Sequence, residues 1–263
     1  PLLQAYQNGL EYGIIALSRE RSRLFQASKY SIVEIELGSD VPVSFEDAMK
    51  YDRPEEQLHQ QTITSADGGK TPIFHGHVES DQENKNLRRF FRKLDAGIMN
   101  ADINFDQPFV LVGLDYLHSI YRDASNIPDI LERGLDSNPD AMDIQSLHDQ
   151  TWDIVQESVK SSLDQAVARY QAVHGSKLGT SEITEIPLAA FHGKVDTLLV
   201  EKRTQLRGSM DPAKNKLRLE EDGEVDLIKF SVNQTLLNGG TVYVFEEEEM
   251  PIGETPIAGV LRY

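Results

Sequence analysis

Four basic residues recur at helical spacing in the first half of the chain. Arg88, Arg89 and Arg92 follow Lys85 at offsets of three, four and seven, which places all four on one side of an α-helix, with Lys93 at its flank. Clustered cations of this kind contact the phosphates of nucleic acids. The pattern predicts an RNA-binding surface, and the alternative is an ordinary solvated helix face.

Two histidines precede this helix in a polar stretch. His75 and His77, with Asp81, could offer two imidazoles and a carboxylate to a metal, since residues two apart in an extended segment share one side. His59 could be a fourth ligand. A histidine pair in a polar loop is also typical of solvent-exposed side chains. We therefore keep His75 and His77 as loop candidates and expect no metal site and no cofactor.

Three other positions could do chemistry but have simpler explanations. Asp115 follows a predicted strand, where a carboxylate could be catalytic, yet an Asp there usually caps the next helix. Trp152 lies on the apolar side of a predicted helix, which indicates a core residue. The run Glu246 to Glu249 is predicted to be a solvated turn, or else a docking surface for a basic partner protein. No Ser-His-Asp or nucleotide-binding glycine spacing is present, so we predict no catalytic residue.

The elements that position these residues follow from hydrophobic periodicity. Strands are predicted at residues 12–17, 23–28, 31–37, 108–114, 195–200 and 241–245, and helices at residues 87–98, 147–170, 187–191 and 225–237. Residues 38–84 are polar, acidic and interrupted by Gly and Pro, which predicts a long loop that is either disordered or functional. Residues 136–140 have the composition of a linker between two domains.

Composition restricts the class of protein. A chain of 263 residues predicts two domains of about 120 to 140 residues each. The net charge of −17 argues against a protein that coats nucleic acid nonspecifically. Cysteine is absent, and no apolar run approaches the roughly 20 residues of a membrane span, so the cytoplasm is the expected compartment and no membrane is expected as a partner. A chain that begins at Pro1 rather than Met fits a piece of a longer protein.

Several blocks of sequence resemble one protein family. They are LSRERSRLF (17–25), VGLDYL (112–117), AFHGKVDTL (190–198), VDLIKFSVNQTLLNGGTVYV (225–244), EMP (249–251) and AGVLRY (258–263). Together they are similar to the archaeal and eukaryotic class I peptide-chain release factors and to pelota, and most of all to the bacterial release-factor-like proteins. The likeness covers most of the chain, and no block in it is a catalytic signature.

The resemblance implies a fold, and it allows this chain to be compared with the catalytic motif of the release factors. Residues 1–141 are expected to form an RNase H-like domain and residues 142–263 a three-layer α/β/α domain, so the fold class is α/β. Release factors carry a catalytic Gly-Gly-Gln loop followed by an Arg-rich helix. This chain has the Arg-rich helix but only Gly68-Gly69-Lys70 in place of the motif. Pelota also lacks Gly-Gly-Gln and is the better guide.

The predicted function is that of a non-catalytic, ribosome-binding factor that acts in ribosome rescue or stress. The basic helix would contact rRNA or tRNA. The second domain would contact a translational GTPase or a ribosome-splitting ATPase. Two alternatives stay open: a peptidyl-tRNA hydrolase that works through residues 66–84, and a protein-interaction module with no ribosomal role.

Overall fold

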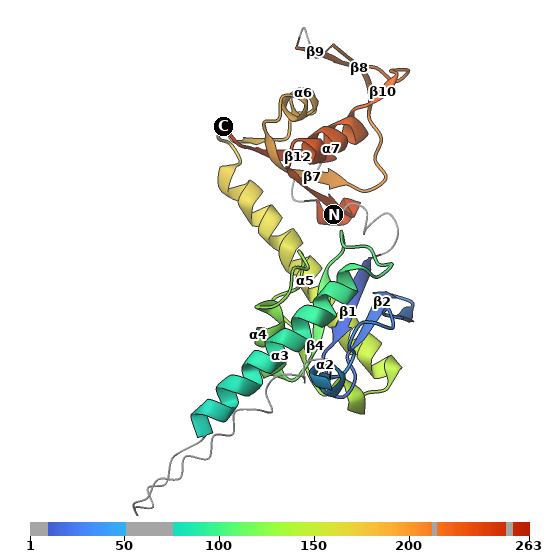
Figure 1. Cartoon of the computed structure of the whole chain (residues 1–263). Coiled ribbons are helices and arrows are strands. Elements are labelled where there is room, and N and C mark those ends of the chain that lie inside the picture. Colours follow the sequence, from blue (N-terminus) through green and yellow to red (C-terminus); the bar gives the residue numbers. More distant parts are fainter. Residues whose placement is uncertain (1–9, 51–75, 212–214, 251–254) are drawn as a thin grey trace, which may run out of the picture. The chain divides into compact units, whose positions relative to one another are not determined.

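The computed structural model describes residues 10–50, 76–211, 215–250 and 255–263, without the side chains of residues 76–81 and 248. The chain divides into two compact α/β units, and the division falls within helix α5 (Ile144–Val173), between Gln156 and Glu157 (Figure 1). The domain boundary between residues 141 and 142 stays a prediction. Within the described parts of the chain, no helix is both long enough and apolar enough for a membrane span.

A five-stranded sheet forms the centre of the first unit. Its strands are β1 (Glu11–Ala16), β2 (Arg23–Ser28), β3 (Ile32–Ile35), β4 (Phe109–Gly113) and β5 (Leu135–Asp136). Their order is β3-β2-β1-β4-β5; the first three are antiparallel, whereas β1, β4 and β5 are parallel. The strands predicted at residues 12–37 and 108–114 are confirmed, and the order and directions are those of the expected RNase H-like sheet.

Helices cover both faces of this sheet. Helices α2 (Phe45–Lys50), α3 (Gly76–Met99) and α4 (Asp115–Arg122) share one core with the sheet. On the other face the beginning of α5 packs through Thr151, whose hydroxyl lies 3.2 Å from the Tyr12 hydroxyl. Burial raises the pKa of Tyr12 to about 12, so this hydroxyl stays protonated. Trp152, predicted to be a core residue, is only half-buried, with its ring centre 6.1 Å from that of Tyr12.

The prediction of a long loop at residues 38–84 is wrong near both ends of that range. Helix α2 lies inside it, and α3 begins at Gly76, well before the first residue of the apolar stripe. The Ser44 hydroxyl accepts a hydrogen bond from the Asp47 amide at 3.1 Å and donates one to the Asp47 carboxylate at 2.8 Å, a polar cap that hydrophobic periodicity does not detect. Residues 51–75 lie outside the described part of the chain.

Residues 136–140, predicted to be a linker, contact the first unit. Asp136 belongs to β5, and Pro139–Ala141 form a 3-10 helix, η2. Arg23 Nη2 donates to the Pro139 carbonyl at 2.8 Å, and the Ser18 hydroxyl donates to Asp140.

The second unit is a three-layer α/β/α domain, as expected. Its sheet has the order β11-β7-β12-β6, from β11 (Thr241–Phe245), β7 (Val195–Glu201), β12 (Ile257–Leu261) and β6 (Gly179–Thr180). Helices α6 (Ile186–Phe191) and α7 (Leu227–Leu237) cover one face, and the end of α5 covers the other through Ala166 and Tyr170. The predicted helices and strands of this unit are confirmed to within a few residues.

A small second sheet extends from this unit. It pairs β10 (Val225–Asp226), β8 (Arg207–Asp211) and β9 (Lys216–Leu219) in that order. The helix predicted from residue 225 therefore begins two residues later, because Val225 and Asp226 pair with β8. The Asp226 carboxylate then caps α7 by accepting hydrogen bonds from the amides of Ile228 and Lys229. After β11, Glu247–Glu249 form a short 3-10 helix, η4.

A buried carboxylate fixes α3 against α4. Asp95 has no exposed surface and accepts four hydrogen bonds: from the Tyr121 hydroxyl (3.1 Å), the Ser125 hydroxyl (2.6 Å), the Asn126 amide (2.9 Å) and the Asn126 side chain (3.1 Å). Burial first, and then the Asp95 charge, raise the pKa of Tyr121 well above 10, so its hydroxyl remains a donor. This network holds α3 against α4 and the residues that follow it.

We expect the network to be costly to break. Replacing Asp95 with Ala leaves several buried donors without an acceptor and should lower the free energy of unfolding by about 3 kcal/mol or more. Tyr121→Phe removes one donor and should cost about 1 kcal/mol. Urea unfolding followed by circular dichroism measures both. Asp102 is exposed, so Asp102→Ala is the control and should change the free energy of unfolding by less than about 0.5 kcal/mol. If Asp95→Ala changes it no more than this control does, the network is not stabilising.

His118 is a second buried polar group on α4. It is 4% exposed, and its Nε2 has no hydrogen-bond partner within the described structure. The ring lies against Gly134, where an added Cβ would approach Cε1 to 2.7 Å. Burial and then the Arg122 charge lower the pKa of His118 below 6.5, while Asp115 and Asp136 oppose the shift. The folded state therefore holds this imidazole neutral.

Acidification should consequently weaken the first unit. Because the folded pKa of His118 lies below the unfolded value of 6.5, the unfolded chain binds more protons in this window. The stabilising contribution is complete above pH 6.5 and is lost as the pH falls through the folded pKa. A His118→Leu variant should therefore lose less stability than the wild type between pH 7.5 and pH 5, as measured by urea unfolding. Identical pH dependence in the two proteins would contradict this.

Candidate nucleic-acid interface

Helix α3 has one basic side and one buried side. Lys85, Arg88, Arg89 and Arg92 are exposed, and Lys93 is half-buried at their flank. The buried side comprises Leu87, Phe90, Phe91, Leu94 and Ile98, each no more than 1% exposed. The two sides predicted from spacing are confirmed, with Phe90 as an addition to the apolar stripe. Whether the basic side binds RNA stays a prediction.

The cations on this side differ in their contacts. Arg88 Nη2 lies 2.9 Å from Asp123 Oδ2 at the end of α4, and both side chains are more than half exposed, so the pair contributes no more than about 1 kcal/mol. Arg89 and Lys93 also make polar interactions. Within the described part of the chain, Lys85 and Arg92 form no ion pair. A phosphate reaches these two without displacing a described carboxylate.

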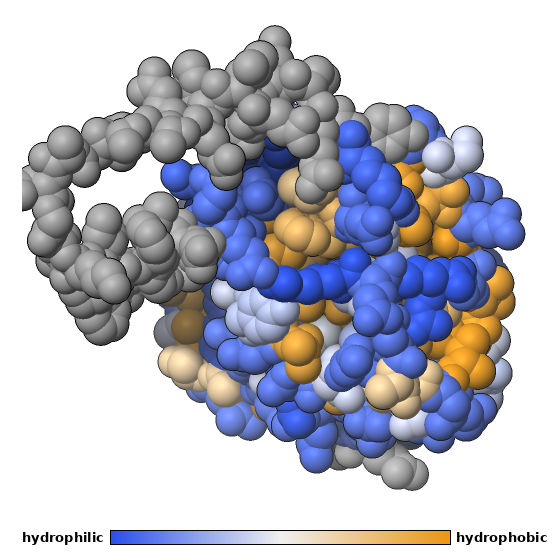
Figure 2. All heavy atoms as spheres, turned by 60° about the horizontal axis from the view of Figure 1, so that its bottom comes forward, coloured by the Kyte–Doolittle hydropathy of each residue, from blue (hydrophilic) through white to orange (hydrophobic). Residues whose placement is uncertain are grey.

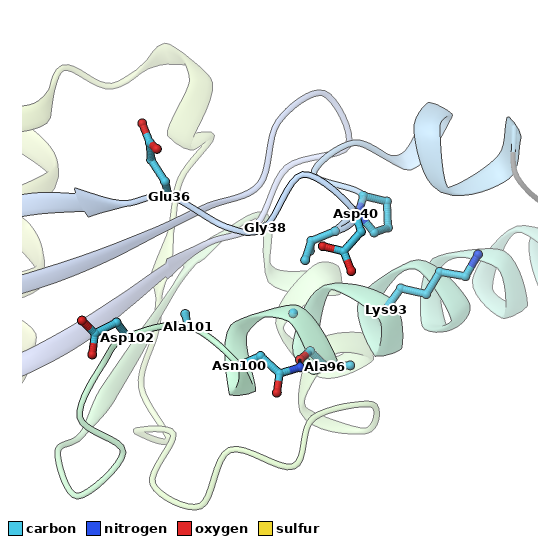
Figure 3. Close-up of a pocket in the computed structure, with 11 residues that line it drawn as sticks. Glu36, Gly38, Asp40, Lys93, Ala96, Asn100, Ala101 and Asp102 are labelled. Atoms are coloured by element: carbon cyan, nitrogen blue, oxygen red, sulfur yellow. Dashed lines mark hydrogen bonds between the residues drawn. The ribbon is translucent and has the colours of Figure 1, made fainter.

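A hollow of about 590 Å³ lies beside Lys93 (Figure 3). One wall is the segment after β3, and the other is the end of α3 with the residues that follow it. Glu36, Asp40 and Asp102 line it, and Asp40 lies across the hollow from α3 (Figure 3). Because carboxylates repel phosphate, a nucleic acid bound along α3 should not extend past Lys93 into this hollow.

Polar and aromatic residues gather where β1 and β4 end. Arg19 follows β1, and its Nη2 lies 2.7 Å from Glu83 Oε1 on α3. The Arg19 guanidinium lies 5.7 Å from the ring centre of Phe45 and 5.9 Å from that of Tyr116. The sequence analysis did not identify this group. Figure 2 shows hydrophobic patches between hydrophilic residues on the face that it turns forward.

Asp115 does not cap helix α4, so that prediction is wrong. The helix begins at Asp115 itself, and Leu114 in the cap position offers no side-chain hydrogen bond. The Asp115 amide instead donates to Asp136 Oδ1 at 3.0 Å. The cap thus comes from the end of the neighbouring strand β5, which local sequence signals do not reveal.

The loop candidates are largely outside the described residues. Gly68, Gly69, Lys70 and His75 lie in the segment that is not described. His77 belongs to α3, so the extended backbone assumed for a metal-binding pair with His75 is wrong at this position. Among the described residues, no three His, Asp or Glu side chains form a group that could hold a metal ion.

The acidic run at the end of β11 belongs to the second unit. Glu246 forms an ion pair with Lys202, and Glu247 and Glu249 are exposed. Glu247–Glu249 form η4, so the predicted turn after the strand takes this form. A role as a docking surface stays a prediction.

Comparisons with known proteins identify the family. No curated protein matches the chain significantly. The chain is similar to archaeal Pelota in a model of ribosome-bound Pelota and ABCE1, with 13% identity, a TM-score of 0.44 and coverage of 95% of this chain and 61% of that one. It is also similar to S. cerevisiae Dom34, described as a translation termination-like factor in RNA quality control that interacts with Hbs1, with 12% identity, a TM-score of 0.49 and coverage of 96% and 63%.

The chain thus spans about three fifths of the length of these two proteins. The model of bacterial archaeo-eukaryotic release factor family 3 matches residues 11–194. The match confirms the family resemblance expected from the sequence, and because it spans well over half of the 263 residues, the chain belongs to bacterial archaeo-eukaryotic release factor family 3.

Proposed function

We propose that this protein is a cytoplasmic, ribosome-binding factor that acts in ribosome rescue or stress and does not release peptides. The single observation that supports this best is the exposed basic side of α3 in a release-factor relative whose net charge is −17. In so acidic a chain, four exposed cations on one helix side create a local positive field that favours phosphate. The ligand is rRNA or tRNA.

The second unit serves as the protein-binding part in this proposal. Its exposed acidic residues Glu247 and Glu249 follow β11, the edge strand that pairs in parallel with β7. Such a surface attracts a basic region of a partner protein. The partner class is a translational GTPase or a ribosome-splitting ATPase.

The sequence supports the proposed absence of peptide release. Gly-Gly-Gln does not occur in the chain, and cysteine is absent. Gly68-Gly69-Lys70 keeps the two glycines but replaces the amide side chain with an ammonium group. The competing function, a peptidyl-tRNA hydrolase acting through residues 66–84, rests on this segment and on its position before a basic helix.

Reversing the charges on α3 should abolish ribosome binding. In the variant Arg88→Glu, Arg89→Glu, Arg92→Glu, the fold should persist, because these side chains are exposed and such changes usually cost under about 0.5 kcal/mol each. Each lost phosphate contact should also reduce the slope of log affinity against log salt by nearly one. The measurement is cosedimentation with purified ribosomes across a salt series, with circular dichroism to check the fold.

A matched control carries the same change of charge elsewhere. Arg207→Glu, Lys216→Glu, Arg218→Glu alters three exposed residues of the small sheet β10-β8-β9. It should retain ribosome binding and the wild-type salt dependence. If both triple variants lose binding equally, the effect is one of net charge; if the α3 variant binds as the wild type does, α3 has no RNA-contacting role.

Peptidyl-tRNA on programmed ribosomes should remain intact when the purified protein is added. The reason is the missing Gly-Gly-Gln amide together with the lack of a cysteine and of a recognisable catalytic triad in the sequence. Release of labelled peptide is the measurement, with a true release factor as the positive control. Stoichiometric release that disappears in Gly69→Ala or Lys70→Ala would instead establish the hydrolase.

A further inference from the structure

Tyr116 lies at the edge of the first sheet where two parallel strands end. It is the second residue of α4, directly after β4, and Arg19 follows β1 in the same way. Because β1 and β4 are parallel, their carboxyl ends meet at one edge. Ligands of open α/β sheets bind outside this edge, which makes an exposed aromatic residue there a candidate contact.

The Tyr116 ring is supported from within the unit. Arg19 approaches both the Phe45 ring and the Tyr116 ring to within 6 Å of their centres, and the Glu83 carboxylate on α3 holds its guanidinium at 2.7 Å. The ring is thus positioned before any ligand arrives. Tyr116 nevertheless remains 43% exposed, and the adjacent Leu114 is 45% exposed.

This aromatic group lies close to the basic side of α3. Tyr116 is at the start of α4, and Asp123, at the end of that helix, pairs with Arg88. Asp123 is seven positions after Tyr116, which corresponds to about 10 Å along the helix axis. A single strand of RNA whose phosphates contact α3 therefore has a neighbouring base within reach of Tyr116.

The charges near Tyr116 favour a base over a phosphate. Asp115 and Asp136 are both exposed at the same sheet edge. Their carboxylates repel phosphate, whereas the neutral face of a base is compatible with them and its exocyclic amines are attracted to them. Stacking of unpaired bases on aromatic side chains is a general mode of single-strand recognition.

We propose that Tyr116 stacks on an unpaired base of the RNA whose phosphates lie along α3. The inference rests on the proposed function, since it takes the RNA from the basic side of that helix. Tyr116 contributes base contact, and Arg19 is a positioning residue that supports its ring. The ligand class is single-stranded RNA with accessible bases, such as a loop or an unpaired end.

The test compares RNA with and without bases. Fluorescence anisotropy measures binding of the full chain to a labelled single-stranded RNA and to the same strand built from abasic nucleotides, which keeps the number of phosphates. The wild type should bind the base-containing strand more tightly. Tyr116→Ala should weaken that binding by roughly tenfold, leave binding to the abasic strand unchanged and keep the same salt slope. Tyr116→Phe, which retains the ring, should bind as the wild type does.

Tyr30 provides the matched control. It is an exposed tyrosine of the same unit, 86% exposed, and likewise lies beside a cation, Lys29. Tyr30→Ala should bind both strands with wild-type affinity. Equal losses in Tyr30→Ala and Tyr116→Ala, no loss in Tyr116→Ala, or equal wild-type affinity for the two strands would each overturn the stacking role, as would no binding to either strand.

The two proposals fail in different ways. The Arg88, Arg89 and Arg92 charge reversal should weaken binding to both strands and reduce the salt slope. If it does so while Tyr116→Ala has no effect, stacking is wrong and the phosphate contacts stand. If the wild type prefers the base-containing strand and the charge reversal has no effect, the stacking role of Tyr116 is supported and the phosphate-contacting role of α3 is wrong.

Discussion

The packing of one side of α3 on the five-stranded sheet is the constraint from which the candidate interface follows. Leu87, Phe90, Phe91 and Leu94 are all essentially inaccessible to solvent, and each such side chain contributes roughly 1.5–3 kcal/mol by leaving water. A helix that buries these positions must expose the positions opposite them. The cations therefore face solvent because the apolar side is buried against the sheet. The hydrogen bonds of Asp95 also hold α3 against α4.

Charge then limits where a nucleic acid can lie. The basic side of α3 ends at Lys93, beside a hollow lined by three carboxylates, and Asp115 and Asp136 lie where β4 and β5 end. Phosphate is attracted to a single strip and repelled on both of its flanks. In the proposed function, RNA therefore contacts this chain of net charge −17 along a narrow line, which suits one selected strand better than nonspecific coating.

The sequence predicted the elements whose signal is local and apolar. Strands β1 to β4, β7 and β11 and helices α6 and α7 were placed to within a few residues, because alternation and helical spacing follow directly from which side chains are buried. Strands β5, β6 and β12 were not predicted, although every residue of β12 is buried. The first turns of α3 were missed because their residues are polar, and α2 was missed because its apolar residues Phe45, Ala48 and Met49 lie in a helix of only six residues. The Ser44 and Asp47 cap was a further signal for α2. The cap from Asp136 to Asp115 joins two separate segments, so periodicity could not reveal it.

The same distinction applies to the candidate site. The cations of α3 lie within two helical turns, so their spacing alone predicted a common side, and the structure exposes them together. Arg19, Phe45 and Tyr116 come from three segments that only the order of strands β1 and β4 and the position of α2 bring together. Family membership specifies that sheet order but not these three side chains. Residues that share one side of a helix can therefore be predicted from their spacing in the sequence. Residues brought together at the ends of separate strands can be identified only once the fold is known.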